Sequence, residues 1–87
     1  MKILVVCGNG LGSSFMLELT IKKALMELGK IAEVTHTDLA SAKAEQADIY
    51  IGAEDIVSQL ASKNGHIVSV VNMMSVAEIT LKLEPLL

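Results

Sequence analysis

The stretch K-I-L-V-V-C-G-N-G-L-G-S-S, residues 2–14, is the part of the sequence from which the fold is most readily predicted. Its first five residues are a continuous aliphatic run, which is typical of a strand buried on both faces of a parallel sheet. Glycines at positions 8, 10 and 12 predict a loop over 8–12, and we expect a helix to begin at Ser13. A strand, a loop and a helix in this order indicate an α/β fold, in which binding takes place at the carboxyl ends of the strands.

The remaining sequence continues the alternation of strands and helices. Three more strands are expected, at residues 32–37, 47–51 and 66–71. The strand at 32–37 is the most polar of these, which predicts a place at the edge of the sheet. Apolar residues at helical spacing predict helices over 13–28, over 54–62 and from residue 76 onward. We therefore expect one domain, residues 1–87, built on a parallel sheet that helices cover on both faces.

Local signals mark the ends of the expected helices. Gly29 is a natural stop for the first helix, and Asp38 is placed to cap a short turn of helix. Ser75 and Glu78 have the spacing of a capping box, which predicts the start of the last helix. Glu18 and Lys22 are four residues apart, so we expect an ion pair on the side of the first helix that faces away from the core.

Composition excludes several classes of function. Hydrophobic residues make up 52% of the 87 residues, yet there is one Phe, one Tyr and no Trp, so the core is expected to be aliphatic and stacking platforms for single-stranded nucleic acid are missing. The net charge is −3 and no basic cluster extends beyond Lys22 and Lys23, which argues against a nucleic-acid partner. A single cysteine fits a reducing compartment, and no apolar stretch approaches the roughly 18 residues of a membrane span. We expect a cytoplasmic protein without direct membrane insertion.

The glycine-rich loop after Cys7 predicts an anion site. Alternate glycines allow backbone N–H groups to turn inward, and the start of a helix adds a positive field that suits a phosphate group and favours a cysteine thiolate. Cys7 is therefore the candidate nucleophile for phosphoryl transfer. The candidate phosphate-binding residues are Gly8, Asn9, Gly10, Leu11, Gly12, Ser13 and Ser14. The alternative interpretation is that Cys7 is a small buried apolar residue without a chemical role.

Three other phosphate-binding loops fit this sequence poorly. A dinucleotide fingerprint that starts at Gly8 would require its third glycine where Ser13 stands, and a P-loop requires a lysine that this loop lacks. A cysteine phosphatase requires an arginine clamp, whose place would again be that of Ser13, and the chain contains no arginine. Without a guanidinium to stabilise attack by water, transfer of the phosphoryl group to a partner is favoured over hydrolysis.

The motif C-G-N-G-L-G-S-S, residues 7–14, resembles the phosphocysteine loop of the enzyme IIB components of the bacterial phosphoenolpyruvate-dependent sugar phosphotransferase system (PTS). It is most similar to the ascorbate-type IIB proteins, although Leu11 stands where relatives often have a polar or another apolar residue. The resemblance extends over the whole chain and includes a second, weaker match at V-N-M-M-S, residues 71–75.

This resemblance implies a four-stranded parallel open sheet of order 2-1-3-4, with helices on both faces and the phosphocysteine loop after strand 1. It implies that Cys7 accepts a phosphoryl group from a phosphohistidine of a IIA partner and donates it to a sugar bound by the membrane IIC partner. The implied activity is that of a protein-phosphocysteine–sugar phosphotransferase, with no cofactor and no metal. A different class of function remains open, namely a non-catalytic domain of the same fold that senses phosphate or another anion.

Other polar and apolar residues have both ordinary and functional interpretations. His36, at the end of the second strand, either assists the Cys7 thiolate or is a solvated edge residue, and His66 is expected at the opposite, amino end of the sheet. Cys7, His36 and His66 do not have zinc-ligand spacing. Phe15 is expected in the core, with docking of a partner as its alternative role. Three carboxylates are expected near the loop as helix caps: Asp38, Glu54 and Asp55.

Overall fold

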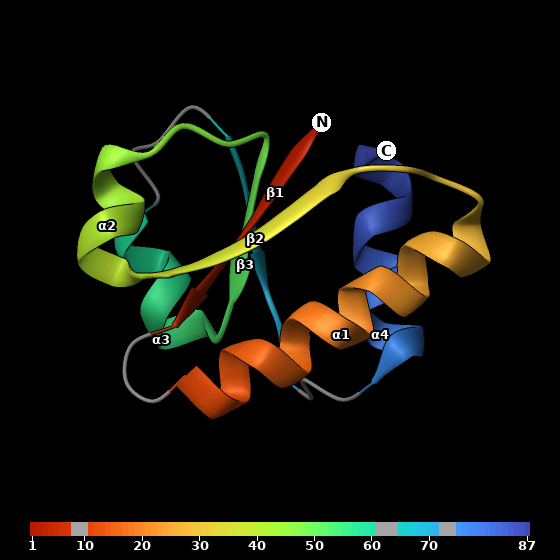
Figure 1. Ribbon diagram of the computed structural model, residues 1–87, viewed down its shortest axis with the longest axis horizontal. Helices are drawn as coiled ribbons and strands as arrows, with labels where there is room; N and C mark the ends of the chain where they lie inside the picture. Colours follow the sequence, from red (N-terminus) through yellow and green to blue (C-terminus); the bar gives the residue numbers. More distant parts are fainter. Residues whose placement is uncertain (8–10, 61–64, 72–74) are drawn as a thin grey trace.

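Four parallel strands form the centre of the protein. A computed structural model describes residues 1–7, 11–60, 65–71 and 75–87, and for residues 7 and 11–14 it describes the backbone alone. The strands are β1 (Lys2–Cys7), β2 (Glu33–Asp38), β3 (Ile49–Gly52) and β4 (His66–Ser69). Their order in the sheet is β2-β1-β3-β4, which confirms the predicted topology and places β2 at an edge (Figure 1).

Helices lie on both faces of the sheet, as predicted. They are α1 (Leu11–Leu28), α2 (Leu39–Ala44), α3 (Glu54–Val57) and α4 (Val76–Leu83), with 3-10 turns at Ser58–Leu60 and Glu84–Leu86. The helices α1 and α4 pack on one face, and α2 and α3 lie on the other (Figure 1). Consequently every loop that follows a strand in this architecture emerges at the same edge of the sheet, the carboxyl edge.

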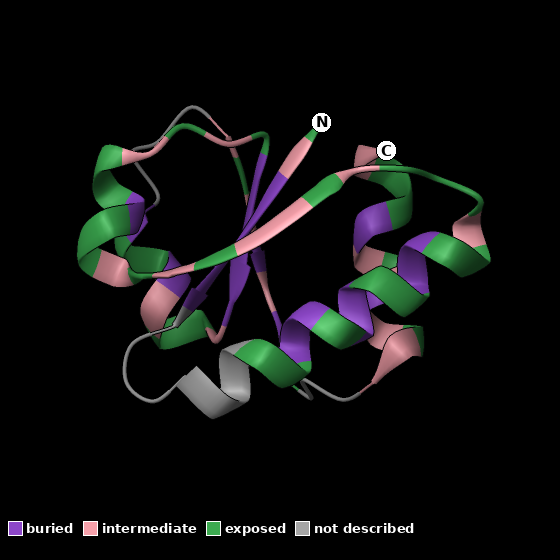
Figure 2. Ribbon diagram, viewed as in Figure 1, coloured by how far each residue is buried: buried purple, intermediate pink, exposed green. Residues whose placement is uncertain are grey.

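The central strand β1 is apolar throughout because both of its faces are covered. Ile3 and Val5 belong to the core under α1 and α4, whereas Leu4 and Val6 belong to the core under α2 and α3. All four are almost fully buried, and β1 and β3 are mostly coloured as buried in Figure 2, whereas the edge strand β2 is not. This two-sided burial explains why a continuous aliphatic run, instead of an alternating one, precedes Cys7.

The predicted ends of several elements differ from the observed ones. The helix α1 begins at Leu11, two residues before the expected start, because the first turn tolerates Gly12. The predicted strand at 47–51 is shifted to Ile49–Gly52, since the N–H of Ala47 donates to the Tyr50 hydroxyl. The last strand ends at Ser69 instead of residue 71 because the N–H of Val71 donates to the Glu78 carboxylate.

The third helix is also shorter than predicted. The α-helical part ends at Val57, and the chain continues as a 3-10 turn to Leu60 instead of an α-helix to residue 62. Both of these apolar residues are buried, so the expected inward face is retained. The predicted end of this helix, residues 61–62, lies outside the described residues.

The predicted helix signals are confirmed at three ends. Gly29 has a φ of 68°, and the N–H of Lys30 reaches back to the carbonyl of Leu25, which closes α1. The Asp38 carboxylate accepts the N–H of Ser41 at the start of α2, and the Ser75 hydroxyl accepts the N–H of Glu78 at the start of α4. Both side-chain caps follow strands at the carboxyl edge, which is also the edge at which Cys7 ends β1.

Candidate functional site

Cys7 ends the central strand and is placed at the middle of the carboxyl edge. Its backbone pairs in register with Asp38 of β2, and β3 lies on the other side of β1. The helix α1 begins four residues later, at Leu11. The predicted phosphate-binding residues Gly8, Asn9 and Gly10 lie outside the described residues, so their role stays a prediction.

The first turn of α1 offers backbone donors to this edge. The N–H groups of Leu11, Gly12 and Ser13 belong to the first helical turn, where no intrahelical acceptor is available to them. The first turn contains no acidic residue that would offset the positive end of the 18-residue helix. The backbone of this segment therefore supports the predicted anion site, while the predicted roles of the Ser13 and Ser14 hydroxyls stay predictions.

Gly52 allows β3 to approach the peptide that precedes Cys7. A Cβ atom at this position would lie 2.5 Å from the carbonyl oxygen of Val6 and 3.3 Å from the side chain of Val57. Contact at 2.5 Å with a backbone atom is not accommodated without movement of β1. The signal in the sequence for this close approach is a glycine that directly follows the expected buried strand at residues 47–51.

His36 lies on the edge strand and is hydrogen-bonded to α1. Its Nδ1 atom is 3.0 Å from Oε1 of Glu18, and its side chain is 43% exposed. In the strand register it stands opposite Val5, two residues before the pair formed by Cys7 and Asp38. The structure thus places His36 near the candidate site but gives it a carboxylate partner on α1.

Glu18 is the residue whose environment was predicted least well. The expected ion pair with Lys22 is present at 3.8 Å, but the Glu18 side chain is only 12% exposed. The prediction that Glu18 faces away from the core is therefore wrong, because the carboxylate turns toward β2 and meets His36. No signal within the helix itself would have found this contact, since its partner is 18 residues away in the chain.

Three exposed carboxylates lie at the carboxyl edge beside the candidate site. Asp38 caps α2 as predicted, and hydrogen bonds from the backbone N–H and the side chain of Ser41 lower the pKa of its carboxyl group below the usual value. The prediction that Glu54 and Asp55 cap a helix is wrong, because the N-cap of α3 is Ala53 and both carboxylates lie in the first turn, where they interact favourably with the helix dipole. All three negative charges lie on the α2 and α3 side of the sheet.

The prediction that Phe15 lies in the core is wrong, since its side chain is 54% exposed. The buried face of α1 contains Leu17, Ile21 and Leu25. A residue two positions before Leu17 is rotated by about 200° around a helix with 3.6 residues per turn, which is nearly the opposite side. Phe15 consequently points away from the sheet, close to the start of α1.

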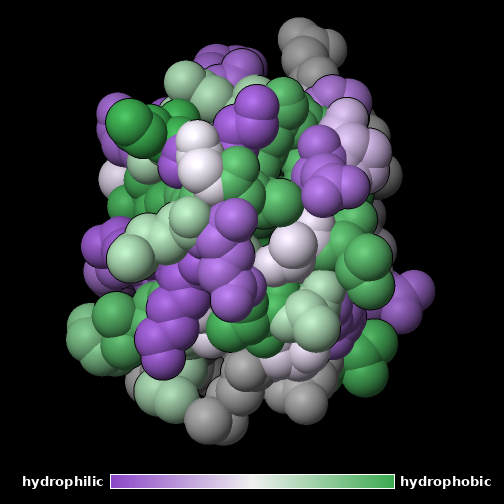
Figure 3. Space-filling view, turned by 90° about the vertical axis from the view of Figure 1, so that its right-hand side faces the viewer, coloured by the Kyte–Doolittle hydropathy of each residue, from purple (hydrophilic) through white to green (hydrophobic). Residues whose placement is uncertain are grey.

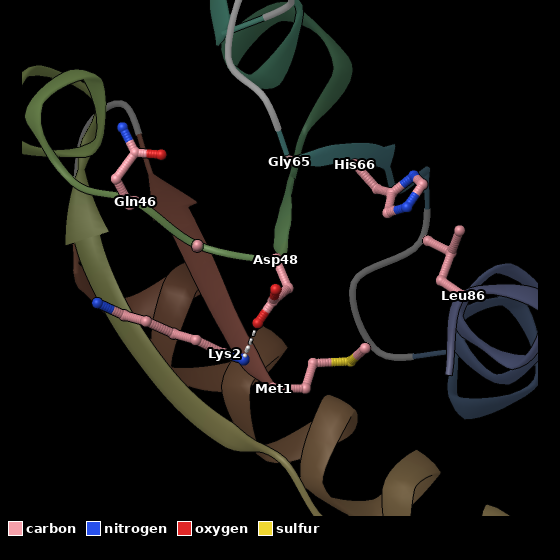
Figure 4. A pocket seen from close by; sticks show the side chains of 8 residues that line it. Met1, Lys2, Gln46, Asp48, Gly65, His66 and Leu86 are labelled. Carbon is pink, nitrogen blue, oxygen red and sulfur yellow. Dashed lines mark hydrogen bonds between the residues drawn. The ribbon is translucent and has the colours of Figure 1, made fainter.

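A shallow cavity of about 480 Å³ lies at the opposite, amino edge of the sheet (Figure 4). Lys2 and Asp48 line one side, where the Lys2 N–H donates to the Asp48 carboxylate at 2.7 Å, and His66 and Leu86 line the other. His66 is therefore at the amino end of the sheet, as predicted. This cavity is separated from Cys7 by the length of the sheet and does not belong to the candidate site.

No group of three or more His, Cys, Asp or Glu side chains among the described residues is arranged to hold a metal ion. No helix in the described part of the chain is long and apolar enough to cross a membrane.

Comparisons with known proteins agree with the motif at residues 7–14. A family model described as "PTS system, Lactose/Cellobiose specific IIB subunit" matches residues 2–84. The ascorbate-specific PTS system EIIB component of Mycoplasma pneumoniae is 32% identical over 80 residues, which cover 88% of this chain and 84% of that protein. The lactose-specific IIB domain of Streptococcus pneumoniae has a similar fold, with a TM-score of 0.57 at 15% identity over 99% of this chain and 89% of that one.

Proposed function

Because this chain belongs to the PTS IIB family, we propose that it is a cytoplasmic phosphocarrier, a single IIB domain of residues 1–87, in which Cys7 carries the phosphoryl group. The observation that best supports the proposal is the position of Cys7, at the carboxyl end of the central strand and directly before a long helix. The start of that helix has N–H groups without an intrahelical acceptor and no acidic residue in its first turn. Such a place favours both a thiolate and a bound phosphoryl group.

The proposed reaction consists of two in-line transfers. In the first, the Cys7 thiolate attacks the phosphorus of a phosphohistidine on a IIA protein, so that an S–P bond forms and the N–P bond breaks. The electron pair of the broken bond returns to the histidine ring, which leaves as neutral imidazole if its other nitrogen is protonated. In the second, a sugar hydroxyl bound by the membrane protein IIC attacks the same phosphorus and gives its proton to a base of IIC or to solvent. An O–P bond forms, the S–P bond breaks, and Cys7 leaves as a thiolate again.

The residues of this chain favour transfer over hydrolysis. The N–H groups of Leu11, Gly12 and Ser13 are positioned to hold the phosphoryl oxygens without any side-chain cation. The sequence contains no arginine, so a guanidinium is not available to stabilise attack by water. A carrier needs this combination, since it must hold a reactive phosphoryl group until the next acceptor arrives.

The sugar is not assigned by these residues. The description of the matching family model names lactose and cellobiose, whereas the relative from Mycoplasma pneumoniae is named for ascorbate. In the proposed reaction the sugar is held by IIC, and this chain supplies only the phosphoryl group. We therefore identify the two partner proteins only by their roles: the donor phosphorylates Cys7, and the acceptor takes the phosphoryl group from it.

The proposal is tested by phosphorylation of Cys7. The protein is incubated with phosphoenolpyruvate, the general phosphotransferase proteins and a IIA protein that is itself shown to be phosphorylated, and its intact mass is measured under mild conditions. We expect one phosphoryl group on the parent and none on the Cys7→Ser variant. A parent that gains none from any phosphorylated IIA protein would support the alternative, an anion-sensing domain in which Cys7 is only a packed thiol.

A further inference from the structure

The carboxyl edge of the sheet is divided into an apolar and an acidic half. On the side of α1, three large apolar side chains are at least 40% exposed, namely Phe15, Met16 and Leu19. On the side of α2 and α3, the three carboxylates are exposed, namely Asp38, Glu54 and Asp55. Cys7 ends the strand that lies between the two helical layers. The three apolar and the three acidic side chains, without Cys7, are called the transfer face.

The three carboxylates of the acidic half take no part in the ion pairs identified among the described residues. Among the described lysines, Lys2 pairs with Glu45, Lys22 with Glu18 and Lys82 with Glu78. None of the ion pairs found among the described residues involves the carboxylates of Asp38, Glu54 or Asp55. With a phosphoryl group on Cys7 the negative charge at this edge becomes still larger, so an approaching protein must supply positive charge.

The apolar half contains the single phenylalanine of the chain in an exposed position. Phe15 and Leu19 are one helical turn apart on α1, so their side chains lie on the same side of the helix as neighbours. The face formed by α4 and the end of α1 also carries exposed apolar residues, and there they are mixed with hydrophilic ones (Figure 3). Large aromatic side chains at the centre of a contact commonly contribute much of the binding energy, and the remaining contacts exclude water.

We propose, on the basis of the phosphocarrier function above, that the transfer face docks the phosphodonor protein through a surface that is apolar opposite α1 and basic opposite α2 and α3. The donor's basic groups neutralise the carboxylates and the phosphoryl group at the same time, which brings the phosphohistidine to Cys7 without repulsion. The apolar contact between the donor protein and Phe15 excludes water from the α1 side of the reacting groups. Specificity for the donor then depends on this chain's charge pattern as well as on Cys7.

The test is the second-order rate of phosphoryl transfer from a phosphorylated IIA protein, measured by rapid quench at low and moderate ionic strength. Phe15→Ser is compared with Met26→Ser, which changes an even more exposed apolar residue of the same helix away from the edge. Glu54→Gln/Asp55→Asn is compared with Glu27→Gln, an exposed carboxylate on α1. We expect Phe15→Ser to lower the rate about tenfold, which corresponds to the loss of one strong interface contact.

The charge variants are expected to change the salt dependence. Glu54→Gln/Asp55→Asn should lower the rate at low ionic strength about fivefold and make it nearly independent of salt, because electrostatic attraction to the donor is lost. The controls Met26→Ser and Glu27→Gln should stay within about twofold of the parent, as surface changes usually do. Circular dichroism before each measurement verifies that every variant is folded.

The outcomes separate this inference from the function on which it rests. If the parent becomes phosphorylated but the transfer-face variants react as fast as their controls, the docking inference is overturned and the carrier function stands. A faster reaction of the Glu54→Gln/Asp55→Asn variant would mean that the donor surface is acidic, which also overturns it. If no phosphorylated IIA protein modifies the parent, the carrier function fails, and the docking inference fails with it.

Discussion

Cys7 and Asp38 are paired residues on the neighbouring parallel strands β1 and β2. The Asp38 carboxylate is exposed and holds the N–H of Ser41 at 2.7 Å, so a negative charge is fixed at the strand end beside the proposed phosphocysteine. The negative charge of Asp38 would repel a phosphoryl group on Cys7, and the repulsion would disfavour the proposed phosphorylated form. The arrangement suits a carrier, because it helps the phosphoryl group to leave.

Asp38→Asn is expected to increase the equilibrium occupancy of the phosphoryl group on Cys7. Asn caps helices about as well as Asp, so the start of α2 is retained while the charge is removed. We expect the equilibrium constant for transfer from the phosphorylated IIA protein to rise about two- to fivefold, from the loss of a partly screened repulsion. Intact mass at fixed ratios of phosphorylated to free IIA measures this constant. An unchanged constant, equal to that of Glu27→Gln, would show that the Asp38 charge does not act on the phosphoryl group.

The same carboxylate is expected to make α2 sensitive to acid. Hydrogen bonds from Ser41 lower the pKa of Asp38 in the folded protein. The stability that this cap contributes is therefore fully present above the pKa of an Asp carboxyl in the unfolded chain, about 3.9. It is lost as the pH falls through the lower pKa that Asp38 has in the folded protein. Urea unfolding from pH 6 to pH 2 should show a larger loss of stability for the parent than for Asp38→Asn, whose cap does not titrate. Parallel profiles for the two proteins would contradict the assignment of the cap.

The hydrogen bond between Glu18 and His36 is expected to hold the edge strand to α1. Glu18 is nearly buried and its two described partners are His36 and Lys22, so its replacement removes contacts that solvent only partly substitutes. We expect Glu18→Ala to lower the free energy of unfolding by about 1–2 kcal/mol and His36→Ala by about 1 kcal/mol. In a double-mutant cycle the two changes should be coupled by at least about 0.5 kcal/mol. Additive effects in urea unfolding would mean that the contact contributes no stability of its own.

Features that depend on neighbouring residues of the chain were predictable, and features that depend on distant ones were not. The cap at Asp38 and the stop at Gly29 are local, since their partners lie within five residues. The sheet order also followed from the motif at residues 7–14, because the resemblance brought the whole topology with it. Burial of Glu18 depends instead on a histidine of another element. The exposure of Phe15, by contrast, was predictable, because the periodicity that identifies the buried face of α1 at Leu17 places Phe15 on nearly the opposite side of the helix.

Gly52→Ala is expected to impair both stability and phosphoryl transfer. The added Cβ would lie 2.5 Å from the carbonyl oxygen of Val6, so the peptide between Val6 and Cys7 must move. We expect a loss of about 2 kcal/mol or more in the free energy of unfolding, as for other changes that force backbone strain. The transfer rate of the folded protein should fall as well, because displacement of a reacting group by about 1 Å strongly lowers the rate of reaction.

Gly65→Ala is the matched control for this change, because it produces an equally close backbone contact at the other edge of the sheet. Its Cβ would lie 2.5 Å from the carbonyl oxygen of Ala47 and 2.7 Å from the ring of Tyr50, far along the strands from Cys7. We expect Gly65→Ala to lower stability by a similar amount while the folded protein transfers phosphoryl groups at the parental rate. Urea unfolding and rapid-quench transfer on both variants separate the two effects. If Gly52→Ala and Gly65→Ala lower the transfer rate per folded molecule by the same factor, Gly52 contributes only to stability and does not position Cys7.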